Sequence, residues 1–521
     1  MSCSKIFSGD LPELIYEIIK YLQNDYSTLY SCVLVNRLWC RLAIPLLWEN
    51  PFSIRTRNYN FIEVYLYNLN DHLKTKLNEY QIIDNLLPSI TLFNYPSFLK
   101  YISIYKAINS VAEWWYGVLK LRNRYFIQDN FGELVCMSLF IMFIENKVSL
   151  HTLEVGISTS YSTYNDNVLE LILQNPNFIY NIRNLKFSIS SSSDNTLIKN
   201  RISQLINLQK NLKKILFGSN SLFMYQSLLL SKESNCSNTL NTIIFHYVNF
   251  KGINNLVEEF ERLNVLESVH IMYCYSLDTS FVQQIINLTK SFKLKSLFIN
   301  EISQIESLNL LLQKSGNYLE NFGCGGIITN FSQSFKRQIL ELIIKYCKSI
   351  KFFDMYRIEN HTISQIIFNL IENIKQNLNY LTIRLWNYQD SNINLIILQD
   401  LGQTLPPKLE YLSLALNIKA IDFKLFLKSS QDTFFKKLVI SNVRQEDGNY
   451  IDILPYVKEY IMKKKRAKYL AIKNTFTVRW ERIIDLFDLK DEVMEFKSHN
   501  IKVLNYINLS TDIYRFLNEI N

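Results

Sequence analysis

Two hydrophobic patterns organise this chain, and the first lies within its first fifty residues. Apolar side chains there recur at helical spacing and form one helix stripe, which consists of Leu11, Leu14, Ile15, Ile18 and Leu22. Asp25 or Ser27 can cap a second short helix, and Asn36 can cap a third. Three short helices bury little apolar surface, so a module of this size gains stability by docking onto a partner.

The second pattern begins near residue 150. A strand-like unit, apolar-x-x-apolar-x-apolar, recurs thirteen times at a mean spacing of about 29 residues. The middle apolar residues of these units are Leu153, Leu185, Ile215, Ile243, Val269, Leu297, Phe322, Phe353, Leu381, Leu412, Leu438, Leu470 and Leu504. Helical patterns lie between the units, for example at 168–173, 285–288 and 339–344. The chain therefore alternates strands and helices over most of its length.

This alternation resembles the leucine-rich repeat, whose usual length is about 20–29 residues. The resemblance implies an α/β repeat solenoid, a leucine-rich repeat horseshoe in which successive units stack side by side. The repeats are degenerate, because few keep the Asn or Cys expected after the strand, Asn249 and Cys274 being candidates. The alternative is an α/β domain of unrelated strands and helices.

The N-terminal features follow one another in an order that resembles an F-box. The landmarks are Leu11-Pro12, the apolar helix through Leu22, the acidic break at Asp25, then Arg37, Trp39 and the ending Pro45-Leu46-Leu47-Trp48. Tyr26 departs from the family pattern, which favours Leu after the acidic break. The alternative is an ordinary helical bundle whose apolar stripes are core.

The F-box resemblance implies a partner and a division of the chain. In this family the Leu-Pro start and the apolar helix faces bury against a Skp-type adaptor, which docks on a cullin. The residues that the resemblance assigns to adaptor contact are Leu11, Pro12, Ile15, Ile18, Leu34 and Trp39. We expect a small all-α F-box module at 5–50, a helical or irregular joint at 51–130, and the repeat solenoid at 131–521. A divergent first repeat near 99–104 can belong to the joint.

The exposed face of the repeat strands is the expected binding surface. Side chains alternate between the two faces of a strand, and aromatic and arginine side chains carry much of the energy of protein interfaces. Such residues gather mainly between the eighth and twelfth units. The predicted substrate contacts are Phe298, Phe352, Asp354, Tyr356, Tyr380, Arg384 and Tyr411. The alternative is that they only shield strand edges, since aromatic residues make up 14% of the whole chain.

Composition and charge change this picture little. Apolar residues make up 48% and charged residues 20%, as in an ordinary soluble globular protein. The net charge of +9 is modest for 521 residues, and the one dense basic cluster is 463–466, followed by Lys468. The cluster is a weak match to a nuclear-targeting or phosphate-binding run, and its alternative is the solvated end of a helix. The apolar run 134–144 is too short for a membrane span of roughly 20 residues and predicts a buried helix.

Residues typical of catalysis or metal binding are not arranged for either. The eight cysteines are scattered without a Cys-x-x-Cys pair, and the six histidines stand singly. His246 and His270 fall in successive strand units and could approach each other. The glycine cluster 323–326 lacks the Lys-Ser/Thr of a phosphate loop, which favours a turn or close packing. We therefore expect neither an enzyme nor a cofactor.

The two resemblances together predict the substrate-recognition subunit of a Skp-cullin-F-box ubiquitin ligase. The F-box would bind the adaptor, the repeat face would hold an unidentified protein substrate, and the protein would be non-catalytic, in the cytoplasm, the nucleus or both. One alternative is a repeat scaffold whose F-box serves a task unrelated to ubiquitin. The other is a nuclear protein associated with nucleic acid, in which the 463–466 cluster would join a wider basic face.

Overall fold

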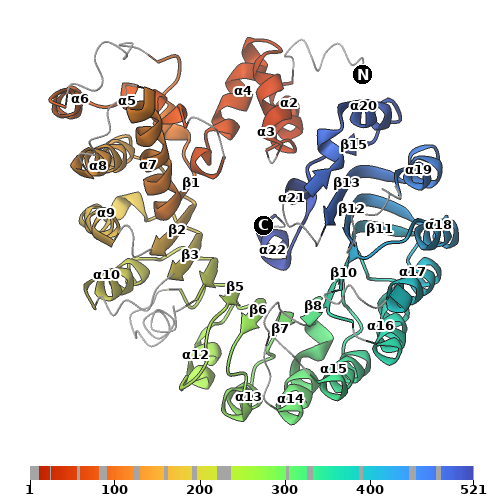
Figure 1. Cartoon of the computed structure of the whole chain (residues 1–521). Helices are drawn as coiled ribbons and strands as arrows, with labels where there is room; N and C mark the ends of the chain where they lie inside the picture. Colours follow the sequence, from red (N-terminus) through yellow and green to blue (C-terminus); the bar gives the residue numbers. More distant parts are fainter. Residues whose placement is uncertain are drawn as a thin grey trace. The chain divides into compact units, whose positions relative to one another are not determined.

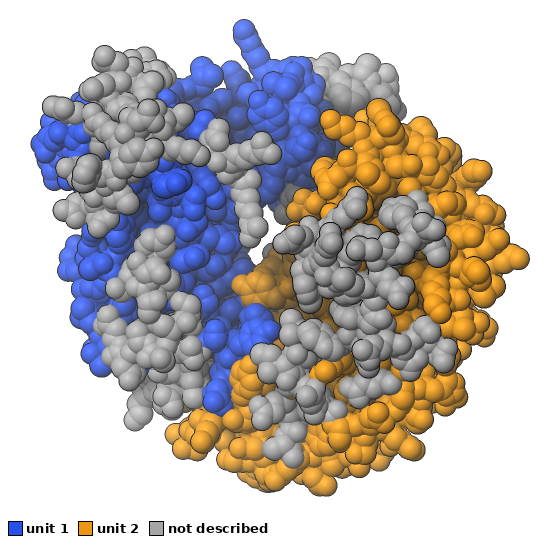
Figure 2. All heavy atoms as spheres, viewed as in Figure 1, with its two compact units in different colours: residues 1–249, 262–267 blue, residues 250–261, 268–521 orange. Residues whose placement is uncertain are grey.

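The computed structural model divides the chain into two compact units. Unit 1 comprises Met1–Asn249 and Arg262–Glu267, and unit 2 comprises Phe250–Glu261 and Ser268–Asn521 (Figure 2). The residues that the structure describes are 11–23, 25–54, 59–80, 91–121, 129–157, 162–189, 196–219, 236–300, 304–324, 332–358, 360–385, 391–444, 453–476 and 483–519. Unit 1 holds the expected F-box segment, the joint and the first strand units together, so the boundaries expected at residues 50 and 130 stay predictions.

Unit 1 begins with three short helices, α2 (Pro12–Lys20), α3 (Tyr26–Val33) and α4 (Arg37–Leu47). The Asp25 side chain accepts a hydrogen bond from Thr28 N at 3.2 Å and so caps α3. The Asn36 side chain caps α4 in the same way, through Trp39 N at 2.9 Å. The core of the three helices consists of Ile15, Ile19, Leu29, Cys32, Ala43 and Leu46.

The rest of unit 1 alternates helices with five parallel strands, β1 to β5. Its elements are η1 (Pro51–Ser53), α5 (Phe61–Tyr67), α6 (Asp71–Asn78), η2 (Tyr95–Phe98), β1 (Tyr101–Ser103), α7 (Ile104–Leu121), α8 (Asp129–Glu145), β2 (Thr152–Ile157), α9 (Ser162–Gln174), η4 (Pro176–Phe178), β3 (Asn184–Ile189), α10 (Thr196–Asn207), β4 (Lys214–Phe217) and β5 (Thr242–His246). Leu153, Leu185 and Ile215 stand side by side in neighbouring strands and are fully buried. The apolar run 134–144 lies within α8, as a buried helix, and none of the described helices is long and apolar enough to cross a membrane.

Unit 2 continues the alternation with longer strands. Its elements are α12 (Leu256–Arg262), β6 (Ser268–Cys274), α13 (Thr279–Ile286), β7 (Leu294–Ile299), α14 (Ile305–Ser315), η5 (Gly316–Tyr318), β8 (Asn321–Cys324), α15 (Gln333–Tyr346), β9 (Phe352–Tyr356), α16 (His361–Ile374), β10 (Tyr380–Arg384), α17 (Ser391–Thr404), β11 (Lys408–Leu416), α18 (Ala420–Ser429), β12 (Phe434–Arg444), α19 (Leu454–Val457), the π-helix η6 (Lys458–Met462), β13 (Ala467–Phe476), β14 (Ile483–Asp485), η7 (Leu486–Asp488), α20 (Lys490–Ser498), β15 (Lys502–Val503), α21 (Tyr506–Leu509) and α22 (Ile513–Glu519). Strands β6 to β13 are parallel. Helices α13 to α18 follow one side of these strands, and α21 and α22 lie on the other side (Figure 1).

The predicted fold class, a leucine-rich repeat horseshoe preceded by an F-box module, is wrong. The described residues instead form an α/β fold, with fifteen mostly parallel strands and alternating helices. The thirteen predicted strand units do coincide with strands, β2 to β13 and β15, and the earlier unit near 99–104 coincides with β1. Strand length, however, varies from two residues in β15 to eleven in β12. Strand β14 runs antiparallel to β13, which also pairs with β15, so the regular order ends there.

Candidate functional site

The N-terminal helices expose a second apolar face beside their core. Leu14, Ile18 and Tyr21 follow one another at i, i+4 and i+7 along α2, so they share one side of that helix. Three more exposed apolar side chains lie on α3 and directly after it. We call the six residues Leu14, Ile18, Tyr21, Tyr30, Leu34 and Val35 the helix patch, and their exposure ranges from 46% for Ile18 to 90% for Tyr21.

The predicted adaptor contacts fall partly on this patch. Ile18 and Leu34 belong to it, and Leu34 is 72% exposed. Leu11 and Pro12 are half-buried at the start of α2. Trp39 is also half-buried and packs against the core of the three helices. The structure thus brings five of the six predicted contacts to positions that are at least partly open.

Ile15 is the exception among the predicted contacts. Its side chain is fully buried in the core of the module, so it can support the patch but cannot touch a partner directly. Helical spacing alone did not separate the two faces, because residues 14, 15 and 18 can all be read as one stripe. The prediction missed four residues of the patch: Leu14, Tyr21, Tyr30 and Val35. The i, i+4 and i+7 spacing of Leu14, Ile18 and Tyr21 was the signal that could have found the first two.

The end of α4 is joined directly to the strands of unit 1. The Glu49 carbonyl accepts hydrogen bonds from the backbone N–H groups of Lys100 and Tyr101, both at 3.0 Å. The Lys100 carbonyl accepts two from His151 and Thr152 in the same pattern, at 2.8 and 3.1 Å. The helix module is therefore tied into the hydrogen-bond ladder that connects β1 to β2.

Aromatic packing reinforces that joint. The Trp48 ring lies 5.1 Å from the Tyr65 ring and 4.4 Å from the Tyr95 ring, measured between centroids. Tyr65 is fully buried and contacts Phe143 of α8 at 5.1 Å. Rings packed in this way give the connection a defined geometry, because aromatic pairs favour particular orientations.

The strand face of unit 1 carries charged side chains. Tyr101 Oη and Ser103 Oγ both donate to the Glu154 carboxylate, the second at 3.2 Å. Lys186 Nζ lies 5.6 Å from the centre of the Tyr101 ring. Burial lowers the pKa of Lys186, and burial together with the nearby charge of Lys186 lowers the pKa of Lys214 to about 8. Two lysines within this face are therefore held in an environment that disfavours their charge.

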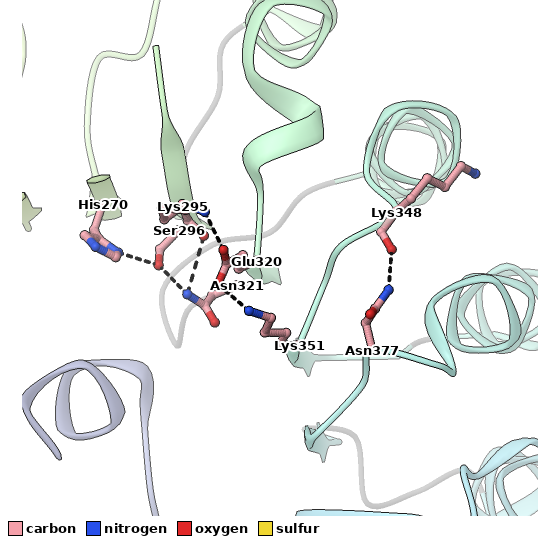
Figure 3. A network of polar contacts seen from close by, with 8 residues as sticks. All are labelled: His270, Lys295, Ser296, Glu320, Asn321, Lys348, Lys351 and Asn377. Carbon is pink, nitrogen blue, oxygen red and sulfur yellow. Dashed lines mark hydrogen bonds and ion pairs between the residues drawn. The ribbon is translucent and has the colours of Figure 1, made fainter. Parts of the chain in front are cut away.

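The first strands of unit 2 carry a buried polar row. His270 Nδ1 lies 2.7 Å from Ser296 Oγ, and the Asn321 amide donates to the same oxygen at 2.8 Å (Figure 3). A register shift in β6 produces this row, since it pairs Met272 with Phe298 and moves His270 beside Ser296.

No cluster of metal-ligating side chains emerges from the described part of the chain. Across those residues, no three His, Cys, Asp or Glu side chains lie close enough together to hold a metal ion. The described cysteines form no disulfide with one another, and burial raises the pKa of Cys136 and Cys324 to about 12 in each case. His246 lies in unit 1 and His270 in unit 2. Residues 325–326 of the glycine cluster lie outside the described residues.

The predicted substrate contacts gather on one face of unit 2, but little of them is open. The strand register places Phe352, Tyr380 and Tyr411 side by side, with ring centroids 5.7 and 5.8 Å apart. Tyr380 and Arg384 are half-buried. The other five predicted contacts are buried: Phe298, Phe352, Asp354, Tyr356 and Tyr411. The prediction that these residues lie exposed on the strand face is therefore wrong for five of the seven.

The C-terminal helices cover these side chains. The Phe516 ring of α22 lies 4.9 Å from the Phe352 ring and 4.6 Å from the Tyr380 ring. Just before α22, the backbone N–H of Thr511 donates to Tyr411 Oη at 3.0 Å. Burial raises the pKa of Tyr411, as expected for a phenol withdrawn from water. We call residues 506–519 the C-terminal cover.

A polar group lies on β9 and β10 beside the aromatic row. Asp354 and Arg384 form an ion pair, and the guanidinium lies 5.6 Å from the centre of the Tyr356 ring. The Asp354 carboxylate raises the pKa of Arg384 above its usual value. Within the described part of the chain, the buried atoms Asp354 Oδ1, Thr382 Oγ1 and Arg384 Nε have no hydrogen-bond partner. Buried polar atoms normally have one, so this group keeps capacity for further hydrogen bonds.

Comparison with known proteins gives no family to which the chain can be assigned. Neither protein-family models nor curated proteins match it.

Proposed function

We propose that this protein is the substrate-recognition subunit of a Skp-cullin-F-box ubiquitin ligase. Helices α2 to α4 would bind a Skp-type adaptor, as the resemblance of 11–48 to an F-box implies. The strand face would hold a protein substrate. The observation that carries the proposal is the helix patch, six large apolar side chains exposed on a module that already has a core of its own.

An exposed apolar surface of this kind is costly to leave in water. Burying one large aliphatic or aromatic side chain contributes about 1.5–3 kcal/mol when it is removed from water completely. Contiguous apolar patches on soluble proteins therefore mark interaction surfaces more often than single exposed residues do. The F-box resemblance names the partner, and the patch supplies the binding energy.

The connection between the module and the strands suits the proposed role. A substrate receptor acts by effective concentration, so the adaptor-binding part and the substrate-binding part must keep a defined relation. The bonds from Lys100 and Tyr101 to the Glu49 carbonyl, and the packing of Trp48, fix the helix module to strands β1 and β2 of unit 1. The protein itself would contribute positioning and no chemistry.

Adaptor binding tests the proposal directly. A pull-down with purified Skp-type adaptor should retain the wild-type chain and lose the Ile18→Asp/Leu34→Asp variant by at least tenfold. The matched control is Ile421→Asp/Met494→Asp, which places two aspartates on exposed apolar positions elsewhere; Ile421 is 71% exposed. Failure of the folded wild type to bind would overturn the proposal. Adaptor binding without recruitment of a cullin would indicate a scaffold unrelated to ubiquitin transfer.

A further inference from the structure

We propose that the surface formed by strands β9 to β11 is a receptor for a partner segment carrying an aromatic side chain, and that the C-terminal cover occupies this receptor in cis. Partner binding and docking of α22 would then exclude each other. The inference rests on the proposed function in one respect: the partner segment would belong to the substrate.

The aromatic part of the receptor is the site where the Phe516 ring of α22 packs. The Phe516 ring packs against Phe352 of β9 and Tyr380 of β10 at centroid distances of 4.9 and 4.6 Å. Phe352 is fully buried beneath it, while Tyr380 stays half-buried. The receptor therefore accepts one aromatic ring edge-on or tilted, which is the arrangement that aromatic pairs favour.

The polar part of the receptor is not used by α22. Three atoms next to the aromatic row have no hydrogen-bond partner among the residues that the structure describes. They are Asp354 Oδ1, Thr382 Oγ1 and Arg384 Nε. They offer an acceptor, a hydroxyl and a donor within two neighbouring strands. A segment that presents amide or hydroxyl groups beside its aromatic anchor would satisfy them. This predicts a polar peptide with one aromatic residue, and not a purely apolar helix.

The cover is held by contacts that can be exchanged. Helix α22 has seven residues, and helices this short are not stable in water without tertiary packing. Its start is held by two hydrogen bonds: Thr511 N donates to Tyr411 Oη, and Arg515 N donates to the capping Asp512 Oδ1 at 2.7 Å. Asp485 Oδ2 accepts from Tyr506 N at 2.8 Å and fixes the preceding helix α21 separately. Arg515 of α22 also donates to the Ile507 carbonyl of α21 at 3.1 Å, so release of α22 breaks this bond while the bond to Asp485 keeps α21 in place.

The test is a binding competition on the full chain. The probe is a fluorescein-labelled peptide with the sequence of residues 510–519, and its binding is followed by fluorescence anisotropy. We expect the Phe516→Asp protein to bind the probe at least tenfold more tightly than the wild type, because its own cover no longer competes. The Ile507→Asp protein is the matched control: it carries an aspartate in the same cover at an exposed position, and its affinity should equal that of the wild type. A probe with Phe516→Asp should bind no variant.

Two outcomes would overturn the inference. One is a folded Phe516→Asp protein that binds the probe no better than the wild type. The other needs no variant: amide hydrogen exchange in the wild type should be at least 100-fold faster in α22 than in β10, and equally slow exchange would show a permanent core contact. Adaptor pull-down with the Phe516→Asp protein separates the two proposals. If neither the wild type nor the variant binds the adaptor while the variant binds the probe more tightly, the result counts only against the proposed function. If both bind the adaptor and the variant binds the probe no more tightly, it counts only against the receptor.

Discussion

Gly323 lies directly beneath the aromatic ring of Phe298. A Cβ built on Gly323 would fall closer than 3.0 Å to both Cδ1 and Cε1 of that ring, and 3.2 Å from the Asp354 carbonyl oxygen. Because a side chain has no room there, glycine lets the ring lie across β8. Of the two roles that the sequence favoured for this glycine, a turn or close packing, the structure shows close packing.

Substitution of this glycine is expected to destabilise unit 2. In Gly323→Ala the Phe298 ring must move out of a buried position, which costs about 1–3 kcal/mol for overpacking of a core. Urea unfolding would measure the loss. Gly117→Ala is the control, because a Cβ there meets nothing within 4 Å and the residue lies exposed in α7. Alanine in a helix interior should stabilise by about 0.5–1 kcal/mol. Equal effects of the two substitutions would contradict the packing argument.

The polar row of unit 2 offers a second test, since two asparagines in Figure 3 make similar bonds at different depths. Asn321 is buried and donates to Ser296 Oγ at 2.8 Å, whereas Asn377 is exposed and donates to the Lys348 carbonyl at 3.0 Å. Asn321→Ala should lower the free energy of unfolding by about 1–3 kcal/mol, because it removes a buried hydrogen bond. Asn377→Ala should cost less than about 0.5 kcal/mol, since water replaces the lost donor. Thermal unfolding of both variants decides whether burial sets the difference.

The alternation of apolar residues predicted the strands well because it is a local property. Leu381 and Leu412 stand in register in β10 and β11, at the positions that the six-residue unit assigned to them. What covers a strand face is not local. Phe516 comes from more than one hundred residues beyond Tyr380 in the sequence, so no pattern around Tyr380 shows that its face is covered. The substrate contacts were therefore placed on the correct strands and given the wrong exposure.

The end of the last predicted unit shows the same limit. Residues 501–506 fit the strand pattern, yet β15 consists only of Lys502 and Val503. The chain then turns, because the Asn505 side chain accepts from Ile507 N at 3.0 Å and caps α21. An asparagine inside a strand pattern competes for backbone hydrogen bonds in this way. Asparagine is a common helix cap, so the sequence around Asn505 is also compatible with a helix start. The regular spacing of the repeat favoured a strand there instead.

Lys214 makes the stability of unit 1 depend on pH. Burial lowers its folded-state pKa from the ordinary value of 10.5 to about 8, so above pH 8 the folded state loses this proton before the unfolded state does. The unfolded state then binds more protons, and the free energy of unfolding rises with pH between about 8 and 10.5. Relative to Lys214→Met, the wild type should gain about 1 kcal/mol from pH 8 to pH 9. Urea unfolding at pH 7.5, 8.0, 8.5 and 9.0 measures this difference.

The neighbouring lysine provides the control for this prediction. Lys213 is exposed in the same segment, so Lys213→Met should follow the wild type at each pH. Parallel curves for the wild type and Lys214→Met would show that Lys214 keeps an ordinary pKa in the folded protein, and would contradict the prediction.

The residues of the basic cluster 463–466 differ in their exposure to solvent. Lys463, Lys464 and Lys465 are exposed, whereas Arg466 is buried. Burial also lowers the pKa of Arg466 to about 10. A buried guanidinium cannot join a basic surface, so the alternative of a nucleic-acid-associated protein loses one cation of its only dense cluster.

Arg466 should instead be essential for the stability of unit 2. Its guanidinium donates to the carbonyls of Leu427 and Thr433, both at 3.0 Å, and to the carbonyl of Ser430, and so satisfies the end of α18. Arg466→Lys keeps the charge but loses the planar fork of donors, leaving buried carbonyls unpaired. We expect a loss of about 3–5 kcal/mol, which thermal unfolding would detect as a lower midpoint. Lys464→Ala, at an exposed position of the same cluster, should change stability by less than about 0.5 kcal/mol. A stable Arg466→Lys protein with weakened, salt-dependent nucleic-acid binding would reverse this assignment and favour a basic surface.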